Sequence, residues 1–276
     1  MSRIEEALEK ANKLRGVHNS EAPTEKTASA PVDDIFKTEA PISVDNPYLV
    51  TVTEPDSPAA EEYRKLKSMV VNITKRGNFQ NTLMVTSTIG GEGKSLTALN
   101  LAITLSQEYD HTVLLADADL RQPSIHSYLG MDPQKGLSDC LCNGKDIGSV
   151  LVKTGIGKLV VLPSGSRVSN PVELLSSNKM KELVKELKHR YADRYIIIDT
   201  PPILPFAEAH AIGSVVDGVI FVVKERHASL NNIKDALGML KHANILGVVY
   251  NDVDIERYDN YYQYYYHRSG NKKRST

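Results

Sequence analysis

A glycine-rich segment that follows an apolar run contains the residues with the clearest chemical meaning in this chain. Residues 88–95 read TIGGEGKS. The glycines let the backbone turn its N–H groups inward around a phosphate, and a helix that begins near Lys94 adds its positive end. Lys94 can then contact the outer phosphates of a nucleotide, and the Ser95 hydroxyl can bind Mg²⁺. The predicted nucleotide-binding residues of this segment are Gly90, Gly91, Glu92, Gly93, Lys94, Ser95 and Leu96.

This segment departs at one position from the general phosphate-loop pattern G-x-x-x-x-G-K-[ST], because Thr88 replaces the first glycine. The alternative interpretation is a glycine-rich turn that binds nothing. Its position between a strand-like run and a helix-like run favours the nucleotide site.

Three carboxylates follow apolar runs elsewhere in the chain. Asp117 and Asp119 lie in VLLADADLR at 113–121, and Asp199 ends the run IIID. Alternate residues of an extended segment face the same way, so Asp117 and Asp119 can point at one site. One such residue alone would be interpreted as a helix cap or a turn residue. Three of them beside a phosphate loop indicate Mg²⁺, which takes a few oxygen ligands together with water and phosphate.

Tyrosines are concentrated near the C-terminus, where six occur within nine residues: Tyr258, Tyr261, Tyr262, Tyr264, Tyr265 and Tyr266. A phosphoryl-transfer site and a cluster of phosphate acceptors on one chain suggest a kinase that modifies its own tail. The alternative is a low-complexity segment with no acceptor role.

The elements that must position these residues alternate between strand and helix. Short apolar runs predict strands at 82–87, 112–117, 158–162, 195–199, 217–223 and 246–250, and helical segments are predicted at 94–108, 178–190 and 229–243. Such alternation predicts an α/β fold with a mostly parallel sheet and helices on both faces. Ligands of these folds bind at the carboxyl ends of the strands, where all three motifs place their polar residues.

The chain is expected to have four parts. Residues 1–16 predict an amphipathic helix, with a capping box formed by Ser2 and Glu5, that docks either on its own domain or on another protein. Residues 17–57 are rich in Pro, Ser, Thr, Glu and Ala, which predicts a mostly disordered linker. Residues 58–255 are the predicted catalytic domain, opened by a helix that starts at Pro58. Residues 256–276 are the predicted flexible tail.

Composition limits the class of protein. The net charge of −1 gives no strong bias toward nucleic acid, and no nucleic-acid partner is expected. No apolar run approaches the roughly 18 residues that a membrane span needs, and the N-terminus is too acidic for a signal peptide. Cys140 and Cys142 fit a reducing compartment. A cytoplasmic protein is therefore predicted, with any membrane role arising through a partner.

The segments LMVTSTIGGEGKS, VLLADADLR and YIIIDTPP resemble the Walker A, Walker A′ and Walker B motifs of bacterial tyrosine kinases. The resemblance extends from about residue 58 to 266 and includes the tyrosine cluster. It implies a P-loop NTPase-like domain that uses ATP and Mg²⁺ to phosphorylate tyrosine in protein. One departure is Gly90, where the family usually has proline before GEGK.

The resemblance also implies roles for the polar residues, position by position. Lys94 and the loop amides would hold the phosphates. Ser95 and Asp119 resemble the direct Mg²⁺ ligands, and Asp199 would hold a metal-bound water. Asp117 is positioned to accept the tyrosine proton or to orient the hydroxyl.

Other residues are assigned by the same resemblance. Asn251 resembles a residue that contacts the adenine, although a turn asparagine is an alternative. Arg121 completes D-x-D-x-R and is expected in a salt bridge or on a phosphate. Glu61, Arg64 and Lys67 resemble the family's E-x-x-R-x-x-R motif, which implies a ring in which one subunit's tail enters the next subunit's site. A solvated helix face is the alternative, and Lys67 lacks the planar fork of arginine.

The implied partners lie in polysaccharide export. A membrane polysaccharide co-polymerase would activate the kinase, and a tyrosine phosphatase would reverse the modification. The chain resembles the stand-alone kind of relative, so it is expected to be cytoplasmic and peripheral to the inner membrane through its partner. The segment MSRIEEALEKANKLRG is similar to that of autokinases from exopolysaccharide export clusters, including those linked with exosortase systems.

Two other functions compete with an autokinase. A cell-division or partition ATPase would carry an extra lysine in K-G-G-x-G-K-[ST], and Ile89 occupies that position here. A nucleotide-gated adaptor of polysaccharide chain length would need no chemistry, but the intact set Lys94, Asp117, Asp119 and Asp199 argues against an inactive site.

Overall fold

The structure is a computed structural model of the 276-residue chain, and it describes residues 44–190 and 193–254. Several predicted features lie outside the described residues. These are the N-terminal helix over 1–16, most of the linker over 17–57, and the six tyrosines of the tail. The described residues contain no helix with the length and apolarity that crossing a bilayer requires.

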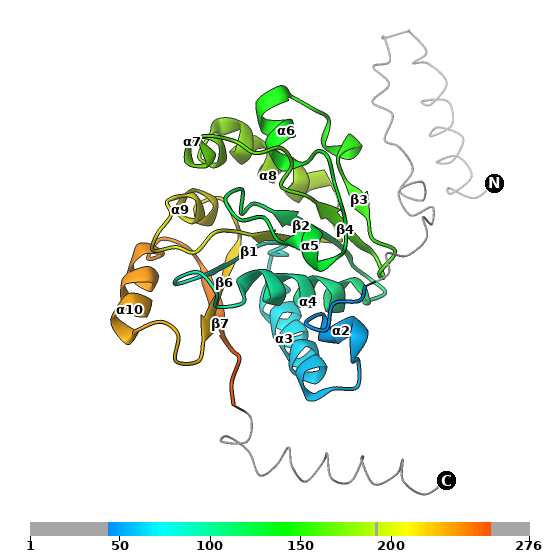
Figure 1. The fold of residues 1–276 in the computed structure, drawn as a ribbon, viewed down its shortest axis with the longest axis vertical. Coiled ribbons are helices and arrows are strands. Elements are labelled where there is room, and N and C mark those ends of the chain that lie inside the picture. The colour runs from blue at the N-terminus through cyan, green and yellow to red at the C-terminus, as the bar shows by residue number, and fades with distance from the viewer. Residues whose placement is uncertain (1–43, 191–192, 255–276) are drawn as a thin grey trace, which may run out of the picture. The chain divides into compact units, whose positions relative to one another are not determined.

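A seven-stranded sheet forms the centre of the described part, with strand order β3-β4-β2-β5-β1-β6-β7 (Figure 1). All neighbouring strands are parallel except β3 and β4. The strands are β1 (Thr82–Ser87), β2 (Thr112–Asp117), β3 (Val152–Lys153), β4 (Leu159–Leu162), β5 (Arg194–Asp199), β6 (Gly218–Lys224) and β7 (Ile245–Asn251). The six predicted strands and the mostly parallel α/β fold are confirmed. The two-residue strand β3 was not expected, because so short a segment shows no recognisable pattern of apolar residues in the sequence.

Helices cover both faces of the sheet, and the central strands divide their side chains between two cores. Leu83 and Val85 of β1 face one core, whereas Met84 between them faces the other. The first core packs α2 (Val50–Thr53), α3 (Pro58–Thr74), α4 (Lys94–Ser106) and α5 (Ile125–Tyr128). The second packs α6 (Leu137–Asn143), the 3₁₀ helix Ile147–Ser149, α7 (Pro171–Leu175), α8 (Asn178–Arg190), α9 (Glu208–Gly213) and α10 (Leu230–Met239).

Helix α3 begins where the sequence predicts. Ser57 caps it by accepting a hydrogen bond from the Ala60 N–H at 3.2 Å, and Pro58 occupies the first turn. The helix ends at Thr74, whose hydroxyl bonds to the Val70 carbonyl at 2.7 Å and lies 2.8 Å from the Tyr195 hydroxyl of β5. These contacts fix α3 against the sheet.

Residues 44–57, predicted as the end of a disordered linker, are instead part of the folded unit. Leu49 is fully buried in the core of α3 and α4, and Thr51 in α2 is also buried. The Thr51 hydroxyl donates to the Asn100 side-chain oxygen at 2.9 Å, and the Asn100 amide donates to the Tyr48 carbonyl at 3.1 Å. The prediction was wrong here because one buried leucine and one amide network order the segment, and its average composition does not reveal them.

Replacing Leu49 with alanine should therefore destabilise the domain by about 2–5 kcal/mol, the usual loss for a buried leucine. Urea denaturation followed by circular dichroism measures the change. Tyr48→Ala is the matched control, because the Tyr48 side chain is 66% exposed. Equal effects of the two substitutions, or no effect of Leu49→Ala, would show that the segment behaves as a linker after all.

Candidate functional site

The phosphate loop connects the carboxyl end of β1 to the first turn of α4. Gly91 and Gly93 have φ angles of 82° and 85°, in the left-handed region that favours glycine. A Cβ atom on Gly93 would lie 2.1 Å from the Asn251 side-chain nitrogen, so a larger residue would displace that side chain and would also strain the backbone. The expected helix at 94–108 is present as α4, which begins at Lys94 and ends at Ser106. Its N-terminus faces the loop, as a phosphate site requires.

Two predicted nucleotide-binding residues, Glu92 and Asn251, hold the loop in shape. The Glu92 carboxylate is fully buried and accepts hydrogen bonds from the N–H groups of Ile89 at 2.8 Å and Lys224 at 3.4 Å. The Asn251 side chain, at the end of β7, donates to the Glu92 carbonyl at 2.9 Å. The loop is thus tied to the ends of β6 and β7 as well as to its own strand.

His227 is a loop contact that the sequence analysis missed. Its Nε2 lies 2.8 Å from the Gly90 carbonyl oxygen, and a Cβ on Gly91 would lie 3.3 Å from the same nitrogen. The hydrogen bond requires a proton on Nε2, which then donates to the carbonyl. Gly90 is also the position where a proline was expected from the resemblance. The imidazole therefore restrains a residue whose own backbone is unusually free.

Replacing His227 with alanine should weaken ATP binding by about 2–10-fold, the equivalent of one hydrogen bond. The double variant Gly90→Pro/His227→Ala should recover part of the loss, because proline restricts the same backbone. Isothermal titration with a non-hydrolysable ATP analogue measures both. His242→Ala, an exposed residue before β7, is the control. An unchanged affinity in His227→Ala would exclude this role.

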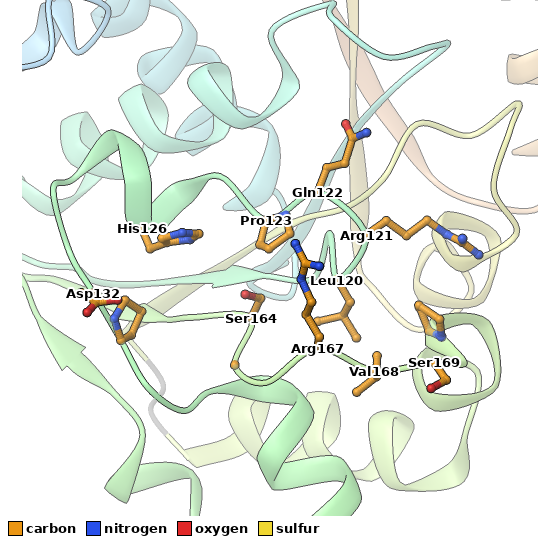
Figure 2. A pocket seen from close by; sticks show the side chains of 13 residues that line it. Leu120, Arg121, Gln122, Pro123, His126, Asp132, Ser164, Arg167, Val168 and Ser169 are labelled. Carbon is orange, nitrogen blue, oxygen red and sulfur yellow. The ribbon is translucent and has the colours of Figure 1, made fainter.

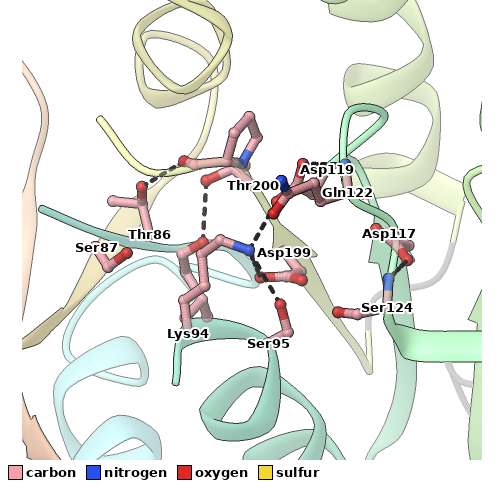
Figure 3. A network of polar contacts seen from close by, with 12 residues as sticks. Thr86, Ser87, Lys94, Ser95, Asp117, Asp119, Gln122, Ser124, Asp199 and Thr200 are labelled. Carbon is pink, nitrogen blue, oxygen red and sulfur yellow. Dashed lines mark hydrogen bonds and ion pairs between the residues drawn. The ribbon is translucent and has the colours of Figure 1, made fainter. Parts of the chain in front are cut away.

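The four predicted catalytic side chains converge beside the loop, at the carboxyl edge of three neighbouring strands (Figure 3). Asp117 of β2 and Asp199 of β5 are paired in the sheet register. Lys94 Nζ donates to Asp119 Oδ2 at 2.8 Å and to Ser95 Oγ at 3.1 Å, and it lies 4.0 Å from Asp199 Oδ1. The structure thus brings together residues from three separate sequence motifs.

The backbone after β2 fixes the two aspartates of that strand. Asp117 Oδ2 accepts hydrogen bonds from the Ser124 and Ile125 N–H groups at 3.1 and 3.2 Å. Asp119 Oδ1 accepts one from the Gln122 N–H at 3.0 Å. The loop from 120 to 124 therefore sets the orientation of both carboxylates.

Burial and crowding of like charges perturb these groups. Burial raises the pKa of Asp117 to about 8, and the Asp199 and Asp119 carboxylates add to the rise. Burial also raises the pKa of Asp199, to about 6, against the opposing charge of Lys94. Burial alone would lower the pKa of Lys94, but Asp199, Asp119 and Asp117 outweigh it and the pKa is raised. Such perturbation is typical of functional sites.

The residues present fit Mg²⁺. Within the described residues, both carboxylate oxygens of Asp199 and Oδ1 of Asp117 are buried without a hydrogen-bond partner. No three His, Cys, Asp or Glu side chains of the described part form a complete metal cage. Mg²⁺ does not need one, because it usually binds one or two carboxylates together with phosphate oxygens and water. A hydroxyl from Ser95 and carboxylates from Asp119 and Asp199 match that requirement.

The raised pKa of Asp117 makes the stability of the nucleotide-free, metal-free protein depend on pH. The folded state binds the proton of the Asp117 carboxyl more tightly than the unfolded state, whose aspartate pKa is about 3.9. The stability that this protonation gives the folded state is therefore lost as pH rises toward 8. The free energy of unfolding of Asp117→Asn, relative to that of the wild type, should therefore rise by at least about 1 kcal/mol from pH 5 to pH 8. That rise is the equivalent of one pKa unit. Urea denaturation in EDTA at both pH values tests this. A constant difference would contradict it.

The remaining predicted residues have contacts within the chain. Arg121 Nε donates to the buried Glu208 at 2.6 Å, so the salt bridge expected as one alternative is present. Arg64 forms an ion pair with Glu61 and donates to the Pro55 carbonyl. Lys67 forms an ion pair with Glu108. The three residues expected at a subunit contact thus lie on α3, where Arg64 and Lys67 contact neighbouring segments of the same chain and Glu61 pairs with Arg64.

Comparison with known proteins supports the same family as the motifs. The AAA domain family matches residues 80–246. The chain is 35% identical to the tyrosine-protein kinase YwqD of Bacillus subtilis (strain 168) over 219 residues, which cover 78% of this chain and 90% of YwqD.

Two solved structures are similar to most of this chain. The kinase domain of the Escherichia coli tyrosine kinase ETK has a TM-score of 0.69 and 28% identity, and the match covers 74% of this chain and 80% of that one. The chimerical protein CapA2B2 has the same TM-score and 29% identity, covering 75% of this chain and 90% of the chimera. The chain therefore belongs to the bacterial tyrosine-protein kinase family.

Proposed function

We propose that the protein is an ATP-dependent autokinase that phosphorylates its own C-terminal tyrosine cluster in trans, within an oligomer. The observation that supports this most is the convergence of Lys94 with Asp119 and Asp199, at 2.8 and 4.0 Å, beside a glycine-rich loop. The acceptors would be the six tyrosines between 258 and 266. Glu61, Arg64 and Lys67 are the proposed contact between subunits.

The proposed mechanism depends mainly on positioning and charge, as phosphoryl transfer generally does. Lys94 and the N–H groups of the loop hold the phosphates of ATP. Ser95 and Asp119 would hold Mg²⁺ directly, and Asp199 would act on it through a water molecule. The metal ion neutralises charge on the phosphates when it is bound. Asp117, held by the Ser124 and Ile125 amides, orients the tyrosine hydroxyl and accepts its proton.

The proposed setting is exopolysaccharide polymerisation and export. The kinase would act at the cytoplasmic side of the inner membrane, bound to the cytoplasmic segment of a polysaccharide co-polymerase that activates it. A tyrosine phosphatase would return the tail to its unmodified state. The N-terminal segment 1–16 is the proposed contact with the membrane partner.

Phosphotyrosine mapping tests the proposal. The wild-type chain is incubated with Mg-ATP and its tail is analysed by mass spectrometry, with a variant carrying phenylalanine at all six positions as control. Transfer in trans is tested by mixing a Lys94→Met chain, as acceptor, with an active chain that lacks residues 256–276. Phosphate on the tail of the Lys94→Met chain supports the proposal. ATP hydrolysis without any phosphotyrosine would instead favour a partition-type ATPase.

A further inference from the structure

A cavity of about 710 Å³ lies beside the candidate active site and is not accounted for by nucleotide or metal (Figure 2). Its walls are the loop from Leu120 to Pro123, which follows Asp119, and the segment from Ser164 to Pro171. The volume falls within the range of small-molecule sites. The cavity can therefore hold part of a protein substrate next to the site of phosphoryl transfer.

Positive charge dominates the ionisable groups that line the cavity. The charged groups of the lining are two arginines, Arg121 and Arg167, and one carboxylate, Asp132, and the imidazole of His126 lies in the same wall. Arg121 is held in place, because its Nε donates to Glu208 at 2.6 Å and its guanidinium stacks 4.6 Å from the centre of the Phe206 ring. Arg167 is exposed and has no ion pair or hydrogen bond from its side chain to any other described residue. Figure 2 shows its guanidinium extending into the middle of the cavity.

Apolar side chains form much of the remaining surface. Leu120, Pro123 and Val168 line the cavity together with two further prolines, Pro133 and Pro171. An arginine fork binds a phosphate through two parallel hydrogen bonds, and flat apolar walls suit an aromatic ring. An aromatic ring that carries a phosphate combines both features. The side chain that matches the cavity is therefore phosphotyrosine.

The cavity and the catalytic carboxylates share one loop. The Gln122 N–H bonds to Asp119 at 3.0 Å, and the Ser124 N–H bonds to Asp117 at 3.1 Å. Leu120, Arg121, Gln122 and Pro123 of that loop line the cavity. A group bound in the cavity would therefore place the residues next to it in sequence beside Asp117.

We propose that this cavity binds a phosphotyrosine already formed in the tail of another copy of the chain, so that the first phosphorylation favours the next. This inference rests on the proposed autokinase function. The tyrosines between 258 and 266 are close enough in sequence for one to occupy the cavity while its neighbour meets Asp117. Each transfer breaks the bond between the γ-phosphate and ADP, forms a bond to the phenolic oxygen, and passes the phenolic proton to Asp117.

A binding experiment tests the recognition itself. The full-length protein without ATP is titrated with a fluorescent peptide of residues 256–268, either unmodified or phosphorylated at Tyr262. The phosphorylated peptide should bind at least about 10-fold more tightly, and Arg167→Gln should remove that difference. Arg167→Lys keeps the charge but loses the fork, and should remove most of it. Arg190→Gln, on α8, is the control and should change nothing. Equal binding of both peptides to the wild type would overturn the inference.

A kinetic experiment separates this inference from the proposed function. Intact-mass spectra recorded during reaction with Mg-ATP should show wild-type chains passing quickly from one phosphate to several. The Arg167→Gln protein should acquire its first phosphate at the wild-type rate. Singly phosphorylated chains should then accumulate to a level about 10-fold higher than in the wild type. If the substitution slows the addition of the first phosphate and of later phosphates equally, the inference is overturned, because the cavity would then bind the tail whether or not it is phosphorylated. Absence of phosphotyrosine in the wild type would instead refute the autokinase function.

Discussion

Lys94→Met is expected to lower the rate of autophosphorylation by about 100–1000-fold, or about 3–4 kcal/mol of transition-state stabilisation. The substitution removes an ammonium group that contacts Asp119 at 2.8 Å and lies 4.0 Å from Asp199. In the proposed mechanism the same group stabilises charge on the transferred phosphoryl group. Radioactive phosphate transfer from ATP, measured as initial rate, gives the effect directly.

The matched control for this prediction is Lys181→Met. Lys181 is an exposed residue of α8, on the helical layer that does not contain α4. The rate of autophosphorylation of the Lys181→Met variant should stay within a factor of two of the wild-type rate. Urea midpoints of both variants should be recorded first, since Lys94 compensates buried carboxylates in the free protein. Undiminished transfer by a folded Lys94→Met variant would refute the assignment of the site.

The second large effect is expected at the two aspartates after β2, which should fail in different ways. Asp117→Asn keeps an oxygen that accepts the Ser124 and Ile125 N–H groups, so the loop should stay in place. It removes the proton acceptor, and the rate of transfer should fall by about 100–10,000-fold, as for other general bases. ATP affinity should change little.

Asp119→Asn is expected to act on binding instead. It replaces a carboxylate that interacts with Lys94 and is proposed to bind Mg²⁺, so both ATP affinity and the Mg²⁺ concentration needed for half-maximal rate should shift. Titration calorimetry with Mg-ATP and rate measurements over a Mg²⁺ series distinguish the two variants. If both lose ATP affinity to the same extent, the division of roles is wrong.

Local patterns were sufficient to predict the strands and the convergence of Lys94 with three aspartates at one edge of the sheet. The strands are continuous apolar runs, because a parallel sheet covered on both faces buries every residue of runs such as β1 and β5. Their polar residues follow directly at the carboxyl ends, so Lys94, Asp117, Asp119 and Asp199 could be expected at one edge. The helix predicted over 178–190 matches α8 in both bounds.

The features that were missed depend on contacts between distant segments. His227 meets Gly90 across 137 positions of sequence, and the order of the strands is a property of the whole sheet. Short helices such as α5 and α9, of four and six residues, are too short to show the helical repeat of apolar residues by which a helix is recognised. The segment 44–57 was assigned to the linker because its polar composition conceals the single side chain, Leu49, that is completely buried.

The attachment of residues 44–57 to α4 also determines which element first bears a pulling force applied upstream of residue 44. Leu49 and Thr51 fasten the incoming chain to α4, through the core and through Asn100, before the chain enters α3. Asn100 lies six positions after Lys94 on that same helix. Tension on the chain upstream of residue 44 is therefore first resisted by the helix that carries Lys94 and Ser95. Force applied there would reach the nucleotide site through α4, without any contact at the site itself.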